Sequence, residues 1–165
     1  MRATRNGRIG VIGTVGTIAS GAYQRAAAAI DDSLELTCAA CPGFVEFVES
    51  GDVESDQVHV LAERLLAPMK AADVDTLVLG CTHYPLLART ISDVMGHAVT
   101  LVSSADETAF AVRDRLVELG LEQTTSRIGR HRFVSSGDVD TFRELGSRLL
   151  GPELDHTEHW EPPAP

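Results

Sequence analysis

Residues 75–87, DTLVLGCTHYPLL, decide the fold. The run 76–79 is short, mostly apolar and followed by glycine, which is typical of a strand buried in a sheet. Cys81 comes directly after that glycine, and Pro85 favours the start of a helix because proline suits the first helical turn. The stretch therefore predicts a buried strand that passes through a tight turn into a helix ending near Met95.

The same alternation of short apolar runs and helical patterns continues in both directions. Pro68 should kink or end the helix in which it lies, because a proline inside a helix removes a hydrogen bond. Repeated strand–helix alternation predicts an α/β fold, a mostly parallel sheet with helices on both faces, which binds ligands at the carboxyl ends of its strands. We expect further strands at 8–13, 34–40, 99–102 and 132–135, and helices at 17–30, 44–50, 55–72, 104–119 and 139–150.

Two of these helices have candidate caps. Thr14 or Thr17 can cap the first helix, and Ser103 or Ser104 can cap the helix that ends near 119. Glu107 lies three residues after Ser104, as in a capping box. We treat residues 1–150 as one domain, because no linker interrupts them, and expect the proline-containing tail 151–165 to be disordered.

Composition narrows the class of partner. The chain has 165 residues and a net charge of −10, which argues against nucleic acid as a main partner but leaves a small anionic substrate open. Its apolar runs are too short to span a membrane, and its basic first residues lack the apolar stretch of a signal peptide. We expect a cytoplasmic location, in which the three cysteines are free thiols.

The candidate chemistry centres on Cys81 at the end of the strand 76–79. Backbone N–H groups and the positive end of the following helix would favour its thiolate. His83 could exchange a proton with the thiol or polarise a substrate carboxylate, and Thr82 offers a hydroxyl and an N–H to an anionic group. The alternative is a buried cysteine beside a loop histidine with no chemical role.

Other polar residues give weaker signals when they are considered alone. Thr14 and Thr17 flank a glycine after the first strand, at the same sheet edge as Cys81, but the spacing matches no nucleotide-binding fingerprint. The pair Cys38 and Cys41 forms a lone C-x-x-C with no second pair to complete a zinc site, which favours structural cysteines. Glu49 reads as a solvated surface carboxylate.

The octet GCTHYPLL at 80–87 resembles the glutamate racemases of the aspartate/glutamate racemase superfamily. Related aspartate racemases usually have Glu where this chain has His83. The similarity covers about residues 6–151 and includes IGVIGTVGTIASGAY, ACPGFVEFVESGDV and LVSSADE, at 9–23, 40–53 and 101–107.

This resemblance implies one lobe of a two-lobed fold and racemisation of glutamate without a cofactor or metal. Two cysteines act on opposite faces of the substrate, and the D-glutamate formed supplies peptidoglycan. Cys81 would be the second cysteine, the base toward L-glutamate and the acid toward D-glutamate. His83 would assist its proton transfer and Glu49 would tune that side of the site. Thr82, His83, Thr17 and Thr14 would bind the substrate.

The family's first cysteine, in an Ala-Cys-Asn-Thr run, and its Asp-Ser-Gly-Val-Gly-Gly run do not occur here. We therefore expect a C-terminal lobe that is inactive alone and needs an N-terminal lobe in cis or in trans, with a homodimer possible. Cys41 shares the lobe of Cys81, so we do not expect it to replace the first cysteine. The alternative is a non-catalytic remnant that binds glutamate or another protein and has lost large apolar residues from its interface.

Overall fold

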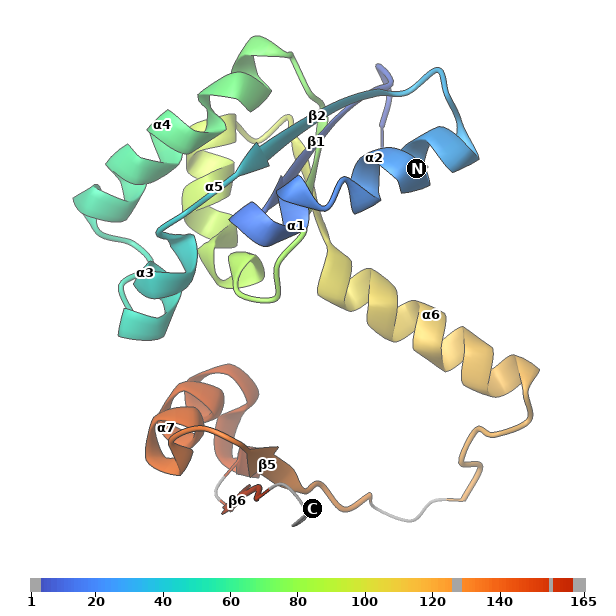
Figure 1. The fold of residues 1–165 in the computed structure, drawn as a ribbon, viewed down its shortest axis with the longest axis vertical. Coiled ribbons are helices and arrows are strands. Elements are labelled where there is room, and N and C mark those ends of the chain that lie inside the picture. The colour runs from blue at the N-terminus through green and yellow to red at the C-terminus, as the bar shows by residue number, and fades with distance from the viewer. Residues whose placement is uncertain (1–3, 126–128, 155, 162–165) are drawn as a thin grey trace. The chain divides into compact units, whose positions relative to one another are not determined.

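The computed structural model describes residues 4–125, 129–154 and 156–161 (Figure 1). The chain forms two compact units, residues 1–122 and 123–165, which are considered separately. Among the described residues, no helix is both long enough and apolar enough to cross a membrane.

The first unit is built on a four-stranded parallel sheet, as expected. Its strand order is β2-β1-β3-β4, so the chain leaves β1 on one side to form β2 and returns to the other side to form β3. Ligands in such folds bind where the strand order reverses, at the carboxyl ends of the strands. In this sheet that place lies between β1 and β3. The strands are β1 (Arg8–Gly13), β2 (Glu35–Ala40), β3 (Thr76–Leu79) and β4 (Thr100–Ser103).

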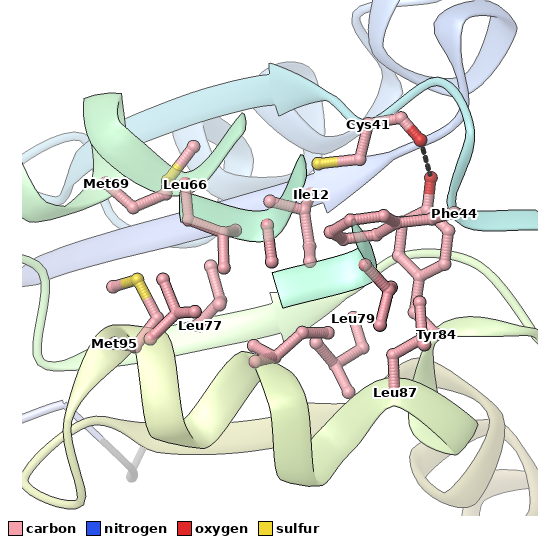
Figure 2. Close-up of a cluster of buried hydrophobic side chains, with 14 of the residues drawn as sticks. Ile12, Cys41, Phe44, Leu66, Met69, Leu77, Leu79, Tyr84, Leu87 and Met95 are labelled. Atoms are coloured by element: carbon pink, nitrogen blue, oxygen red, sulfur yellow. Dashed lines mark hydrogen bonds between the residues drawn. The ribbon is translucent and has the colours of Figure 1, made fainter. Parts of the chain in front are cut away.

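One face of the sheet carries the hydrophobic core (Figure 2). The helices that contribute to this core are α3 (Phe44–Ser50), α4 (Asp56–Ala71) and α5 (Ala88–Met95), with the 3-10 turn η1 (Tyr84–Leu87). Buried side chains recur along α4 at helical spacing, at Val58, Ala62, Leu66 and Met69. They pack with Ile12, Leu77 and Leu79 from the central strands.

The opposite face is bordered by α2 (Ala22–Ile30) and α6 (Ser104–Glu118). A groove of about 1020 Å³ lies on this face, lined by Val11 and Val78 from the strands, Tyr23 from α2 and Val112 from α6. Helices therefore border both faces, which confirms the predicted fold class.

Three local predictions needed correction. The helix expected at 17–30 is two helices, α1 (Val15–Ala19) and α2, because Gly21 takes a left-handed conformation with φ of 64°. Pro68 does not end α4 early, because the helix continues past it to Ala71. The residues after Pro85 form η1 first, and the α-helix begins only at Ala88.

The second unit contains β5 (Phe133–Ser135), α7 (Val139–Leu150), the 3-10 turn η2 (Gly151–Leu154) and β6 (Thr157–His159), which pairs with β5 in parallel. This division differs from the expected single domain 1–150. The ordered η2 and β6 also differ from the expected disordered tail. Leu154 is buried and lies against Gly146, where an added Cβ would be 2.7 Å from Leu154 Cδ1. Residues 155 and 162–165 of that tail lie outside the described residues.

Candidate active site

The carboxyl ends of three strands meet at one edge of the sheet. Gly80, directly after β3, donates its N–H to the Ile12 carbonyl of β1 at 2.8 Å. Cys41, directly after β2, donates its N–H to the Gly13 carbonyl at 2.9 Å. Cys81 therefore follows β3 at the place where the strand order reverses, next to the end of β1.

Cys81, Thr82 and His83 form a contiguous polar group in the turn after β3. The Cys81 Sγ lies 4.0 Å from Nδ1 of His83, and Thr82 Oγ1 lies 3.4 Å from the same nitrogen. Thr82 is exposed, while Cys81 and His83 are partly exposed. The turn itself is closed by Tyr84 N–H, which donates to the Cys81 carbonyl at 3.2 Å.

The other nitrogen of His83 faces a carboxylate from a different element. Nε2 lies 3.4 Å from Oε1 of Glu49, whose side chain is 56% exposed. Glu49 is in the last turn of α3, which ends at Gly51 with φ of 80°. The segment around Glu49, considered alone, predicts a solvated carboxylate, whereas the structure brings it to His83.

The two contacts give the imidazole a defined orientation. An ionised Glu49 can only accept a hydrogen bond, so it favours a proton on Nε2. In the neutral ring Nδ1 is then an acceptor, directed at the Cys81 S–H and at the Thr82 hydroxyl. His83 can take the thiol proton on Nδ1, and Glu49 then faces a cationic ring. This arrangement can generate a thiolate and can return a proton to it.

The helix dipole contributes less than the sequence suggested. We expected an α-helix from Pro85 to favour the Cys81 thiolate, but η1 intervenes and α5 begins at Ala88. Because the dipole acts mainly within the first helical turn, its effect at Cys81 is smaller than that of an α-helix beginning at Pro85.

Thr14 directly follows β1, the strand next to β3, and Thr17 lies in α1. Thr14 caps α1 by accepting from the Thr17 N–H at 3.3 Å, and the two hydroxyl oxygens are 2.9 Å apart. Both side chains are partly exposed. The structure thus brings Cys81, Thr82, His83 and Glu49 into one chain of contacts, and it places Thr14 and Thr17 at the neighbouring strand end.

The other two cysteines have different environments. Cys41 is 1% exposed, and burial raises the pKa of its thiol to about 12. Burial also raises the pKa of Cys38. Both observations fit structural cysteines, and the burial of Cys41 means that it cannot serve as a second reactive thiol. Within the described part of the chain, no group of three or more His, Cys, Asp or Glu side chains is placed to hold a metal ion.

Several residues that support this edge were missed from the sequence. The buried Tyr84 hydroxyl donates to the Cys41 carbonyl at 3.1 Å and joins the Cys81 turn to the start of α3 (Figure 2). Tyr84 also packs edge-on against Phe44. Ser104 donates to the Leu79 carbonyl at 2.7 Å, although the sequence suggested it only as a helix cap. No sequence signal indicates these contacts, because each joins residues 25 or more positions apart.

Comparisons with known proteins show which family this chain resembles. A family model described as Asp/Glu/Hydantoin racemase matches residues 1–112. The chain is 54% identical over 155 residues to a glutamate racemase of Acidothermus cellulolyticus, covering 93% of this chain and 59% of that relative. The solved glutamate racemase isoform RacE1 of Bacillus anthracis matches with a TM-score of 0.92 and 36% identity, over 99% of this chain and 61% of that one.

A second solved structure, the glutamate racemase of Francisella tularensis in complex with D-glutamate, matches with a TM-score of 0.86 and 28% identity. It covers 94% of this chain and 58% of that one. The chain thus spans less than two thirds of the length of each of these relatives. The family model covers more than half of this chain, including all of β1–β4 and the turn that holds Cys81. The chain belongs to the Asp/Glu/hydantoin racemase family.

Proposed function

We propose that this chain provides the Cys81 side of a glutamate racemase active site. The observation that carries the proposal is the chain of contacts from Cys81 through His83 to Glu49, at the reversal point of a parallel sheet. The names of the relatives support glutamate as the substrate, and one of them was solved with D-glutamate bound. The proposed site is in the cytoplasm, where D-glutamate is required for peptidoglycan.

The proposed step is a proton transfer at the α-carbon. The Cys81 thiolate takes the α-proton of L-glutamate and becomes a thiol, which leaves a carbanion on the substrate. A thiol on the opposite face then donates a proton to that carbon and inverts it. In the reverse direction the Cys81 thiol is the donor. His83 holds or returns the Cys81 proton between turnovers, and Glu49 orients His83.

Substrate binding is assigned to hydroxyl groups that follow β1 and β3 at the same sheet edge. Thr82 is next to Cys81 and exposed, and Thr14 and Thr17 are at the adjacent strand end. Their hydroxyl groups can donate to the substrate carboxylates, and His83 attracts a carboxylate when its ring is protonated on both nitrogens. No cofactor is part of the proposal, because two thiols suffice for removal and return of one proton.

A second lobe is part of the proposal, supplied in cis or in trans. One thiol reaches one face of a bound amino acid, so inversion needs a donor on the other face. Helix α6 has apolar side chains that are about half exposed, with values of 52–53% at Phe110, Val112 and Val117. Such surface favours contact with another protein part, whereas a remnant with no partner should have lost it. A second copy of the chain is the competing occupant of this surface.

The test is racemisation of L-glutamate, which is measured as the loss of the circular dichroism signal of the amino acid. The chain alone should show no useful turnover, and addition of the cysteine-bearing N-terminal part of a relative should produce it. Cys81→Ser should abolish that activity, while Cys38→Ser, at a partly buried cysteine outside the site, should retain it. Full turnover by the chain alone would contradict the half-site proposal, and failure of the mixture with each folded part present would contradict the function. Sedimentation of the chain alone shows whether a second copy associates.

A further inference from the structure

We propose that Ser104 and Tyr23 are positioning residues that hold the peptide unit before Cys81 and thereby keep its thiol at His83. This inference rests on the proposed function only in taking Cys81 as the proton-transfer thiol. Both residues lie outside the group formed by Cys81, Thr82, His83 and Glu49. They come from α6 and α2, on the sheet face opposite the hydrophobic core.

The peptide unit in question joins Leu79 to Gly80. Its carbonyl oxygen accepts the Ser104 hydroxyl at 2.7 Å, and its N–H donates to the Ile12 carbonyl at 2.8 Å. Both polar atoms of one peptide unit are thus bound, one by a side chain and one by the neighbouring strand. Rotation of this unit would break two hydrogen bonds, and Cys81 is the next residue along the chain.

Space around Gly80 is closed as well. A Cβ built on Gly80 would lie 2.9 Å from the Ile12 carbonyl oxygen, 3.0 Å from Tyr23 Oη and 3.1 Å from Tyr23 Cε2. The first neighbour is backbone of the central strand and cannot move aside. The Tyr23 ring therefore fills the room in which the chain after β3 could otherwise shift.

Ser104 and Tyr23 together form a clamp on the peptide unit before Cys81. The contact that this clamp would protect, between Cys81 and His83, is long. The Cys81 Sγ and His83 Nδ1 are 4.0 Å apart, at the outer limit for a hydrogen bond to sulfur. A small displacement of Cys81 would lose this contact, whereas the contact of His83 with Glu49 involves a different element, α3. Ser104 and Tyr23 should therefore affect the thiol through His83, without touching it.

Two adjacent serines provide a matched comparison. Ser103 caps α6 by accepting from the Asp106 N–H at 3.2 Å, whereas Ser104 donates to β3. Ser103→Ala removes a helix cap and should reduce stability. Ser104→Ala removes the hydrogen bond to the Leu79 carbonyl and should change the reactivity of the Cys81 thiol.

The readout is the rate of iodoacetamide alkylation of Cys81 in the full chain across neutral pH. Trypsin separates the cysteines, because Cys81 lies in peptide 71–89 whereas Cys38 and Cys41 lie in peptide 26–64.

We expect Ser104→Ala to slow Cys81 alkylation at neutral pH by roughly three- to tenfold, as expected for loss of one hydrogen bond. The same change should have no effect in a His83→Ala background, because the contact it protects is then absent. Ser103→Ala should leave the rate unaltered. Tyr23→Phe, which keeps the ring, should behave like the parent chain, while Tyr23→Ala should slow the reaction.

An unchanged rate in Ser104→Ala, or an equal loss with and without His83, would overturn the proposal. If Ser104→Ala does not fold, the Cys81 alkylation rates of Tyr23→Phe and Tyr23→Ala are compared instead. Equal rates in these two variants would overturn the proposal. Alkylation needs no second lobe and no turnover. If the alkylation results hold but the chain does not racemise glutamate with the cysteine-bearing N-terminal part added, the proposed function alone would be contradicted.

Discussion

His83 Nε2 lies 3.4 Å from Glu49 Oε1, while His83 Nδ1 faces the Cys81 Sγ at 4.0 Å. The two ring nitrogens thus have partners with opposite requirements, a carboxylate that accepts and a thiol that can donate. This relationship makes Glu49 the residue that orients the imidazole, although it does not touch the thiol. It also links α3 to the turn after β3, two segments that are far apart in sequence.

Glu49→Ala should lower the reactivity of Cys81 toward iodoacetamide at neutral pH. The side chain is 56% exposed, and exposed ion pairs contribute about 1 kcal/mol at most, so a two- to fivefold decrease is expected. The control is Glu54→Ala, because Glu54 is also exposed and its partner, Arg89 at 3.2 Å, is outside the site. A decrease of the same size in the control would contradict a specific role for Glu49, as would a neutral His83 protonated on Nδ1 in ¹⁵N NMR spectra.

The three cysteines should react in a fixed order in the native chain. Cys81 is the accessible thiol with a histidine beside it, and burial raises the pKa of both Cys38 and Cys41. At pH 8 we expect Cys81 to be alkylated first, Cys38 slowly, and Cys41 only after unfolding in urea. Mass spectrometry of the labelled peptides measures this order. Rapid labelling of Cys41 in the folded chain would contradict its structural role.

Tyr84→Phe should destabilise the first unit by roughly 1–2 kcal/mol, the cost of leaving a buried carbonyl with one fewer donor. The variant keeps the ring that packs on Phe44 and loses only the hydroxyl bound to the Cys41 carbonyl. Urea unfolding measures the change. Tyr23→Phe is the matched control, since Tyr23 is only partly buried, and it should cost less. An equal loss in free energy of unfolding in the two variants would contradict a stabilising role of the Tyr84 hydrogen bond.

Asp75 should make the first unit sensitive to acid. Burial alone would raise the pKa of Asp75, but hydrogen bonds from Thr4, Arg5, Asn6 and Thr76 outweigh it and lower the pKa from 3.8 to about 2. Because the folded pKa is depressed, this contribution is complete above about pH 4 and is lost as the pH falls toward 2. Urea midpoints should decrease over that range, and Asp75→Asn should remove this part of the decrease.

Asp73→Asn is the control for this titration. Asp73 is 81% exposed and pairs with Arg8, so its replacement should leave the acid-dependent loss in place. A parent chain whose urea midpoint stays constant from pH 4 to pH 2 would contradict the assignment to Asp75.

The regular elements could be predicted from the sequence because their signals are local. The runs 8–13 and 76–79 coincide with β1 and β3, and the alternation of strands and helices predicted the parallel sheet. The errors in the predicted helix boundaries arise at glycine and proline, because each of these residues can either end a helix or lie within one. Gly21 takes a left-handed conformation and divides a helix that the alanine-rich pattern made continuous, and Pro68 lies within α4, which continues to Ala71.

The site was predictable only in part. The positions of Cys81 and His83 follow from a strand end, which periodicity predicts, and from the resemblance of the octet around them. Glu49 came from the resemblance alone, since nothing in its own segment points to His83. The contacts of Ser104 and Tyr84 depend on which elements become neighbours in space, which local patterns do not determine.

The central claim is that Cys81 is the base that acts on L-glutamate. The most direct test is exchange of the α-proton in deuterated water, with the chain combined with a cysteine-bearing N-terminal part and L- or D-glutamate supplied separately. We expect Cys81→Ser to abolish deuterium incorporation from L-glutamate and to leave slower exchange from D-glutamate, whose proton is taken by the opposite thiol. Exchange from L-glutamate that survives Cys81→Ser at the parent rate would contradict the role of Cys81 as the base.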